Sequence, residues 1–431
     1  MPSGDGWLAR LPPLTQPMTP AMLAGLAEAA RMHGNGRIEI SKRGNLQLRG
    51  LPGPDGTALA EALAAAGFDL PQGIPISLDP LADLSGLGEA ARALVRHLHA
   101  AIEAEGLSER LAPKLSLAID LGTPLAPRSL LADIRLALRG QQVHVALGGT
   151  AEQATPLGWI AAGEAVSTVL ALLAHLANHG RESRFTGPHG HARDPDFAAL
   201  ALFRPGAAPA GPTPATTIGA LAGFPLTVHG IGFPFGQVEA DDLAALAEAS
   251  SGLLAIAPAS DRALLLAGRA DAVAATLLRA EARGFITAAG DVRRHIAACA
   301  GSEGCLSGHY ATRSLARSLA ARLGPLLDGS LTLHLSGCRK GCACPDAAAF
   351  TIAGIDKSAA LVLDGQARDA PAAIGSPEGL AARLAELARC VSTRPFGETA
   401  RAALDRLDPF GRTTQTPPPD DRLGGPQDAA G

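Results

Sequence analysis

Hydrophobic and polar positions at the beginning of the chain predict four elements in the order helix, strand, strand, helix. Leu23–Ala30 has helical spacing, Arg37–Ile40 and Leu46–Leu51 alternate as short strands, and Leu59–Phe68 is helical again. Glycine and asparagine between these segments are typical of tight turns. The same order returns in the second half of the chain, at residues 243–250, 253–256, 264–269 and a helix that ends at 281–285.

This repetition indicates an internal duplication. Corresponding segments are separated by about 216 to 220 residues throughout, and long-range similarity at a fixed offset is the mark of a repeat. The alternative is that helices rich in alanine and leucine resemble one another by chance. Because the order and the spacing of four elements agree, we favour duplication.

Further elements follow each repeat. Strands are predicted over 114–120, 133–138, 143–147 and 330–335, and helices over 163–177, 292–300, 314–323 and 379–391. The segment 204–217 is rich in proline, alanine and glycine, which predicts a linker, and the polar tail from Asp408 predicts disorder. The fold class is therefore mixed α+β with internal symmetry, not a doubly wound series of strands and helices.

Composition narrows the functional classes. Of 431 residues, 47% are hydrophobic and 18% are charged, which excludes a wholly disordered chain. A net charge of -4 and an aromatic content of 3% argue against a nucleic-acid partner. The sequence has no apolar run that would form a membrane span or the core of a signal peptide. We therefore expect a soluble, cytoplasmic protein with no membrane partner.

Cysteines carry the strongest chemical signal. The first 298 residues contain none, and five of the six cysteines fall between residues 299 and 344, which indicates a metal site rather than a disulfide scaffold. Cys299 and Cys305 are separated by five residues, and Cys338 and Cys342 by three. Two such pairs suit the four thiolates of a [4Fe–4S] cluster. A structural zinc site, which usually has two to four residues between paired ligands, and unligated thiols are the alternatives.

Residues around the cysteines support the prediction of an Fe–S cluster. Glycines beside the ligands permit tight turns and the close approach of amide donors to sulfide, and they are Gly301, Gly304, Gly337 and Gly341. Arg339 and Lys340 place positive charge between two ligands. We predict that Cys344 is a small buried residue rather than a ligand. Cys390 lies on a predicted helix, and we predict that it belongs to the core.

A set of basic residues lies at loop edges of the first half, namely Arg10, Lys42, Arg43, Arg49 and Lys114. Every second position from Arg43 to Arg49 is polar, which predicts one polar strand face that also includes Asn45 and Gln47. Guanidinium groups bind carboxylates through paired hydrogen bonds, so this face predicts a ligand with many carboxylates. A solvated strand face is the alternative.

Other candidate ligands are less specific. His189, His191 and Asp194 lie in the segment RFTGPHGHARD and are candidate metal ligands, with a solvated loop as the alternative. His334 lies four residues before Cys338 and is a candidate for orienting that loop. The sequence contains no Ser-His-Asp arrangement, phosphate-binding Walker loop, HExxH motif or convincing dinucleotide fingerprint.

The cysteine spacing, the segments HLSGCRKGC and ISKRGNLQLRG, and the duplication together resemble the sirohaem-dependent nitrite and sulfite reductase superfamily over roughly residues 6–400. The resemblance implies that Cys299, Cys305, Cys338 and Cys342 hold a [4Fe–4S] cluster, with Cys342 at the position of the ligand shared with sirohaem. It also implies duplicated ferredoxin-like half-domains, 1–72 and 218–288. Each is followed by a reductase-like α+β domain, 73–203 and 289–405, with the linker 204–217 and a disordered tail, 406–431.

Within this superfamily the chain is most similar to the precorrin-3B synthase family, through segments such as GDGWLARL and APKLSLAIDLG. Arg10, Arg43 and Lys114 match basic positions of the reductases' anion site. Ser116, however, replaces the second lysine of their Lys-x-Lys element, and the segment ISLDP at 76–80 lacks their Arg-Asn. A site without these two cations is poorly suited to holding sulfite or nitrite.

This resemblance implies a monooxygenase of aerobic cobalamin biosynthesis. It would convert precorrin-3A to precorrin-3B by C20 hydroxylation and closure of a ring A acetate γ-lactone, with O2 and electrons from NADH. The implied cofactors are the [4Fe–4S] cluster and a mononuclear non-haem iron. The implied substrate-binding residues are Arg10, Arg43, Arg49 and Lys114, and the catalytic residues stay unknown.

The sequence also leads to expectations about binding partners and oligomeric state, and it leaves alternative functions open. The sequence shows no nicotinamide-binding motif, so a separate electron-donating reductase is a candidate partner. A monomer is expected, because an internal duplication can replace a dimer. The alternatives are a sirohaem-dependent nitrite or sulfite reductase and a non-catalytic Fe–S electron carrier.

Overall fold

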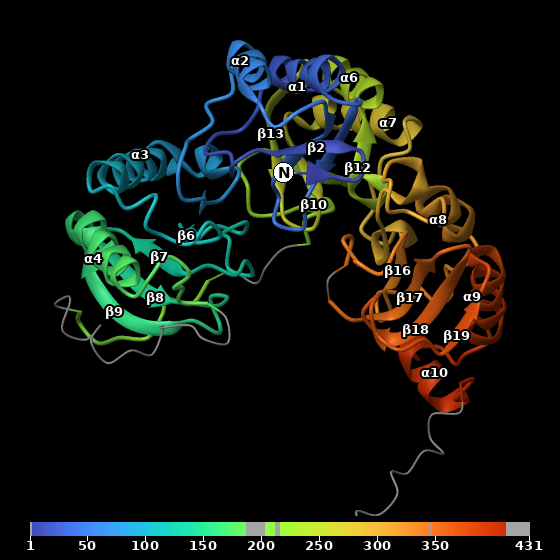
Figure 1. Ribbon diagram of the computed structural model, residues 1–431. Coiled ribbons are helices and arrows are strands. Elements are labelled where there is room, and N and C mark those ends of the chain that lie inside the picture. Colours follow the sequence, from blue (N-terminus) through green and yellow to red (C-terminus); the bar gives the residue numbers. More distant parts are fainter. Residues whose placement is uncertain (1, 187–202, 212–215, 345, 411–431) are drawn as a thin grey trace, which may run out of the picture. The chain divides into compact units, whose positions relative to one another are not determined.

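The computed structural model describes residues 2–186, 203–211, 216–344 and 346–410 (Figure 1). Contacts divide the chain into two compact units. The first comprises Met1–Arg294 with Gly304–Leu306, and the second comprises His295–Glu303 with Ser307–Gly431. The predicted disordered tail lies almost entirely outside the described residues. Among the helices that the structure describes, none is both long enough and apolar enough to cross a membrane.

The first sheet of the first unit has the strand order β1-β2-β4-β3-β12. Its strands are β1 (Pro2–Ser3), β2 (Gly6–Arg10), β3 (Arg37–Ile40), β4 (Leu46–Leu51) and β12 (Gln237–Glu239). Helices α1 (Pro20–His33) and α2 (Thr57–Ala65) belong to the same repeat. Helix α1 begins where the Thr19 side chain accepts a hydrogen bond from the Met22 N–H at 3.2 Å, with Pro20 at the first helical position.

The second sheet contains the corresponding strands of the other repeat in the order β10-β11-β14-β13. These are β10 (Gly219–Leu221), β11 (Thr227–Gly232), β13 (Leu253–Ala259) and β14 (Ala263–Gly268), with helices α6 (Ala240–Ala249) and α7 (Ala270–Ala282). The two repeats exchange backbone contacts, because Val238 of β12 pairs with Ile38 of β3 and Met18 bridges Ile256 of β13. Buried residues of both repeats form one hydrophobic cluster. The half-domains therefore share a core.

Two five-stranded sheets repeat a second topology. One is β5 (Ile76–Ser77), β6 (Leu117–Asp120), β7 (Ile134–Arg139), β8 (Gln142–Leu147) and β9 (Thr155–Ala161). The other is β15 (Ile296–Ala298), β16 (Leu333–Ser336), β17 (Ala348–Ile355), β18 (Ser358–Gly365) and β19 (Ala373–Gly375). In each sheet the first two pairings are parallel and the last two are antiparallel. This shared order confirms the predicted duplication and the α+β class.

The remaining helices lie between or after the strands of these two sheets along the chain (Figure 1). In the first unit they are α3 (Gly88–Ala104) and α4 (Ala165–Asn178), and in the second they are α8 (Thr312–Ala320), α9 (Pro377–Val391) and α10 (Ala400–Leu407). Along the chain, α3 follows the first strand of its sheet and α8 follows the first strand of the other. The helix after the last strand is α4 in one case and α9 in the other.

Two sequence-based expectations need correction or refinement. The helix predicted over 292–300 is wrong, since Val292–His295 is a short 3₁₀ turn and β15 pairs in parallel with β16. Burial of Ile296–Ala298 on a sheet edge outweighs the helical spacing of that short window. The beginning of the predicted linker docks on β9, because Arg204 exchanges two 2.9 Å backbone hydrogen bonds with Trp159.

Candidate functional site

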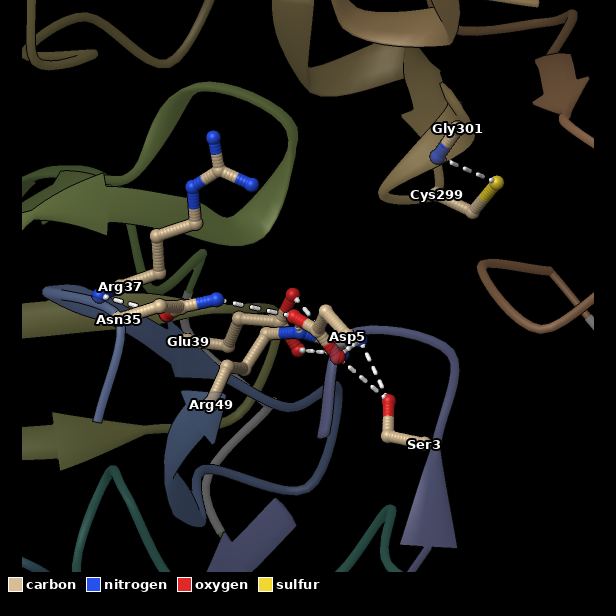
Figure 2. Close-up of polar contacts among 8 residues, drawn as sticks. All are labelled: Ser3, Asp5, Asn35, Arg37, Glu39, Arg49, Cys299 and Gly301. Carbon is tan, nitrogen blue, oxygen red and sulfur yellow. Dashed lines mark hydrogen bonds and ion pairs between the residues drawn. The ribbon is translucent and has the colours of Figure 1, made fainter. Parts of the chain in front are cut away.

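The Cys299 sulfur lies where two loops meet at the ends of the adjacent parallel strands β15 and β16. The backbone N–H of Cys299 donates a hydrogen bond to the Leu335 carbonyl at 3.2 Å. Its sulfur accepts hydrogen bonds from two backbone amides, Gly301 at 3.4 Å (Figure 2) and Gly337 at 3.1 Å. Backbone N–H groups aimed at a sulfur stabilise a thiolate and tune a cluster to which it is bound.

Glycine is required where these loops touch. A Cβ on Gly337 would lie 3.0 Å from Gly301 Cα and 3.1 Å from Gly308 Cα, which are tighter contacts than a side chain normally makes. It would also lie 3.5 Å from the Cys299 sulfur. Gly301 and Gly337, one from each cysteine motif, therefore pack backbone against backbone beside this sulfur. A cysteine sulfur that accepts two backbone amides, as Cys299 does, fits a ligand of an Fe–S cluster.

The second cysteine pair lies in the loop after β16. The Ser336 hydroxyl donates to the Cys338 carbonyl at 2.7 Å, which holds the start of this loop. Cys338 is half-buried and Cys342 is exposed. Lys340 donates to the Ser307 hydroxyl at 3.4 Å, and Arg339 donates to the Asp369 carbonyl at 3.2 Å. The Arg339 side chain is therefore held by backbone carbonyls of the loop after β18.

The buried Tyr310 lies near Cys299. The Tyr310 hydroxyl donates to the Ile352 carbonyl at 2.8 Å and the residue is buried. Burial raises the pKa of Tyr310 well above its usual value, and the electrostatic effect of the nearby Cys299 raises it further. The phenol therefore stays neutral beside the sulfur at any physiological pH.

Cys305 belongs to the first unit, through the short segment Gly304–Leu306. The Leu306 N–H donates to the Gly4 carbonyl at 2.7 Å, which ties this segment to the hairpin of β1 and β2. Cys305 is half-buried. One of the four predicted ligands is thus held by the N-terminal hairpin.

Two further cysteines have different surroundings. Cys344 is half-buried, and its sulfur lies 3.6 Å from the Asp346 carbonyl oxygen. Cys390 is exposed on α9, so the prediction that it belongs to the core is wrong. The reason is helical phase, since Val391 and Ala388 face the core and position 390 falls on the opposite side.

Ligands for a single metal ion are a separate question. Among the described residues, no group of three or more His, Cys, Asp or Glu side chains is arranged to hold one ion. His189, His191 and Asp194 lie outside the described residues. His334 is buried on β16 and paired with Thr351 of β17, and a Cβ on Gly341 would lie 3.6 Å from its ring.

The predicted basic residues lie in the first unit, and Arg43 joins two parts of it. Arg43 lies in the turn between β3 and β4, and donates to the Leu131 carbonyl at 2.6 Å and to the Ser116 hydroxyl at 3.5 Å. Lys114 is exposed two residues before Ser116. Arg43 therefore reaches the segment that contains Lys114. This closeness is what a carboxylate-binding site formed by both residues requires.

Two more cations, Arg184 and Arg10, lie near enough to Arg43 to affect its pKa. Desolvation, followed by the positive charges of Arg184 and Arg10, lowers the pKa of Arg43, against the opposing effect of Asp133. Arg10 is exposed at the end of β2. Several guanidinium groups that repel one another form a site for an anion, because a bound carboxylate relieves the repulsion.

Arg184 was not singled out from the sequence, in which its only signal was its place just before the histidine-containing segment. Asp133 holds Arg184 through contacts of 2.6 and 3.1 Å. The Asp133 side chain is completely buried and also accepts hydrogen bonds from Ser116 N–H at 3.0 Å, Phe185 N–H at 3.1 Å and Thr186. This one carboxylate therefore fixes Arg184 next to the segment that Arg43 reaches.

The prediction that Arg43, Asn45, Gln47 and Arg49 share one strand face is wrong. Strand β4 begins only at Leu46, and Gly44 with φ +83° turns the chain before it. A Cβ on Gly44 would lie 2.8 Å from the Ala259 carbonyl carbon, so the turn packs closely against the other repeat. Gln47 is buried in the sheet.

Arg49 has partners within the protein (Figure 2). Its guanidinium contacts Asp5 at 2.8 Å and Glu39 at 3.3 Å, and it is only 13% exposed. The prediction that Arg49 binds a substrate carboxylate is not tested by this arrangement. Its charge is already balanced by two carboxylates.

A cavity of about 100 Å³ adjoins Arg43 in the first unit. It is lined by the Arg43–Asn45 turn, by the matching turn 258–261 of the other repeat, and by residues 77–78 and 124–127. A space of this size accepts a few atoms, such as the carboxyl group of a larger ligand, rather than the whole of a macrocycle.

Comparisons with known proteins agree with this architecture. Residues 2–66 match the family model of the nitrite/sulfite reductase ferredoxin-like half domain. The solved structure of the NirA protein of Mycobacterium tuberculosis superposes with a TM-score of 0.63 at 18% identity, and the match covers 93% of this chain and 83% of that one. The fold is that of the nitrite and sulfite reductases.

A curated relative is more specific. The chain is 37% identical over 422 residues to a precorrin-3B synthase from Sinorhizobium sp., and this match covers 94% of the chain and 90% of the relative. The chain therefore belongs to the precorrin-3B synthase family.

Proposed function

We propose that this oxidoreductase is a monooxygenase that converts precorrin-3A to precorrin-3B in aerobic cobalamin biosynthesis. The observation that carries the proposal is 37% identity to a precorrin-3B synthase along 94% of the chain. One atom of O2 enters the substrate as the C20 hydroxyl and the other leaves as water. NADH supplies the two electrons, through a separate electron-donating reductase, and the ring A acetate closes the γ-lactone.

The proposed cluster ligands are Cys299, Cys305, Cys338 and Cys342. The amides of Gly301 and Gly337 that donate to the Cys299 sulfur support this assignment. When bound, a [4Fe–4S] cluster supplies single electrons to the reaction. The described residues offer no set of three ligands for a mononuclear iron, and the proposed residue roles do not depend on that ion.

Of the predicted substrate-binding residues, Arg10, Arg43 and Lys114 are kept as proposed carboxylate-binding residues, and Arg184 is added. Arg49, whose site role is untested, is left out of this set because Asp5 and Glu39 already balance its charge. A macrocycle that carries many carboxylates suits several cations of limited mobility. Arg184 is fixed by the buried Asp133, and Arg43 is fixed by the Leu131 carbonyl. These residues bind and orient the substrate, and they place one of its carboxyl groups at the cavity beside Arg43.

The residue at position 116 supports hydroxylation of precorrin-3A rather than reduction of a small anion such as nitrite or sulfite. The reductases have a lysine there, whereas here Ser116 is buried and its N–H donates to Asp133 at 3.0 Å. The Arg43 guanidinium lies at the Ser116 hydroxyl, where a lysine side chain would meet another cation. A sirohaem-dependent nitrite or sulfite reductase remains the second candidate, because the fold is shared.

The decisive experiment is an assay with precorrin-3A under anaerobic conditions, followed by admission of ¹⁸O₂ and mass spectrometry. The proposal predicts a product with one ¹⁸O atom. Failure to add oxygen, with cluster and iron intact and electrons supplied, contradicts it. A strong Soret band in the purified protein would instead indicate sirohaem. Absence of any tetrapyrrole binding would indicate an electron carrier.

Cysteine variants test the ligand assignment separately. Cys338→Ser should lower the iron content of the purified protein and its broad visible absorption at least about twofold, because one of four ligands is lost. Cys390→Ser is the matched control, since Cys390 is exposed on α9 and is not a proposed ligand. Equal iron content in both variants would contradict the assignment of Cys338. Cys344→Ser applies the same measurement to the residue that follows the second pair.

A further inference from the structure

The hairpin at the N-terminus touches Cys305 at a position where a side chain does not fit. Ser3 pairs with Gly6, so Gly4 and Asp5 form a two-residue turn. The Gly4 carbonyl accepts the Leu306 N–H at 2.7 Å. A Cβ on Gly4 would overlap the Cys305 sulfur and lie 3.0 Å from Cys305 Cα. The turn and the cysteine therefore fit together only when residue 4 has no side chain.

Arg49 of β4 holds both neighbours of Gly4 (Figure 2). Its guanidinium donates to both carboxylate oxygens of Asp5 at 2.8 Å and to the Ser3 hydroxyl at 2.8 Å. Ser3 in turn donates to Asp5 at 2.7 Å, and the Asn35 amide donates to Asp5 at 3.1 Å. Glu39 of β3 lies 3.3 Å from the same guanidinium. A single cation thus fixes the conformation of the turn.

We infer that Arg49 and Gly4 are positioning residues for the cluster ligand Cys305, which they act upon through the turn of the β1–β2 hairpin. The inference rests on the proposed function only in taking Cys305 as a ligand. Arg49 fixes Ser3 and Asp5, these fix Gly4, and Gly4 sets the backbone of Leu306 and the space for the sulfur. Residues that orient a metal ligand affect both the affinity for the metal and its potential.

The low exposure of the ion pair explains why the effect should be measurable. The side chains of Arg49 and Asp5 are 13% and 7% exposed. Removal of the guanidinium takes from the buried Asp5 carboxylate its ion-pair partner, which is strongly unfavourable. The turn then relaxes, and the Cys305 segment loses the contact that holds it.

The test compares purified full-length holoprotein of the wild type, Arg49→Met and Gly4→Ala. Iron and sulfide content, the EPR spectrum of the reduced protein and its midpoint potential are measured, together with the unfolding temperature. Arg92→Met is the matched control for charge, because Arg92 of α3 also pairs with two carboxylates, Asp83 and Glu89. Gly53→Ala is the matched control for size, since a Cβ there meets no atom within 4 Å.

A measurement at the sulfur itself is included in case Gly4→Ala does not fold. The rate at which iodoacetamide labels Cys305 is followed by mass spectrometry in each full-length protein, relative to Cys390 in the same molecule. The exposed Cys390 serves as the internal reference. Arg49→Met should raise this ratio about threefold or more, because local opening uncovers the sulfur.

We expect both test variants to lose iron at least about twofold or to shift the EPR signal, while the two controls match the wild type. The inference is overturned if Arg49→Met retains the wild-type iron content, EPR spectrum, potential and labelling ratio. It is also overturned if Arg92→Met changes them as much as Arg49→Met does. A wild-type protein without any cluster instead contradicts the proposed function, and the labelling ratio then decides whether the hairpin covers Cys305.

Discussion

The Gly337 N–H donates to the Cys299 sulfur across 3.1 Å, although 38 positions separate the two residues in the chain. The contact arises because β15 and β16 are adjacent and parallel, so the loops that follow them leave the sheet at the same edge. One loop carries the first cysteine motif and the other carries the second. Parallel pairing therefore brings Cys299 next to the loop that carries the second cysteine motif.

Gly337→Ala should reduce both stability and cluster content. The added methyl group would lie 3.0 Å from Gly301 Cα, and overpacking of this kind typically costs about 1–3 kcal/mol. We expect a lower unfolding temperature and at least about a twofold lower iron content. Gly290→Ala is the control, because a Cβ there meets no atom within 4 Å. Wild-type iron content in Gly337→Ala would show that the two loops have room to separate.

Arg43→Ala should raise the KM for precorrin-3A about tenfold or more. The loss of one charge-assisted contact of about 1.5–3 kcal/mol accounts for a change of this size. Steady-state kinetics at several substrate concentrations measure it. Arg92→Ala, which removes a pair with Asp83 and Glu89 outside the proposed binding set, should leave the KM unchanged. If Arg43→Ala and the wild type have the same kinetics, Arg43 does not bind the substrate.

Asp133→Ala should destabilise the first unit by about 3–5 kcal/mol, because it leaves Arg184 without its buried partner and several N–H groups without an acceptor. Denaturant unfolding measures this change. Asp271→Ala is the matched control, since its pair with Arg269 is exposed and such pairs contribute about 0–1 kcal/mol. Similar losses in both variants would mean that Asp133 has no special role.

The Asp5 ion pair should make stability depend on pH in the acidic range. Burial acts to raise the pKa of Asp5, but hydrogen bonds from Arg49, Ser3 and Asn35 outweigh it and lower the pKa below the usual 3.8. A carboxyl with a depressed pKa in the folded state stabilises the protein above its unfolded pKa. This stabilisation is lost as the pH falls through the folded value.

The free-energy difference between wild type and Asp5→Asn should therefore be largest near neutral pH and should shrink below pH about 3.8. Unfolding curves of both proteins at a series of pH values measure it. Asp133→Asn carries the same chemical change elsewhere in the unit and serves as a comparison. A wild-type to Asp5→Asn difference that stays constant down to the acid limit would contradict the prediction.

Local patterns predicted many elements well because they depend on neighbouring residues alone. Strands β3 and β4 have the bounds that their alternation predicts, and the helix predicted over 163–177 is observed as Ala165–Asn178. The helix predicted over 292–300 was wrong, because pairing of β15 with β16 decides that segment. The four-residue polar face was wrong too, because the turn at Gly44 interrupts the alternation.

Residue types and their separations along the chain already indicate the chemistry available to this protein. Cysteine spacing, the duplicated order of elements and the cations Arg10, Arg43 and Lys114 are all visible in the sequence, because each is a property of residue type and separation. Which of these groups face one another depends on the tertiary structure. It holds Arg184 on Asp133 near Arg43, and it turns Arg49 toward Asp5 and Glu39. Contacts between distant segments depend on strand pairing and packing, which no local pattern specifies.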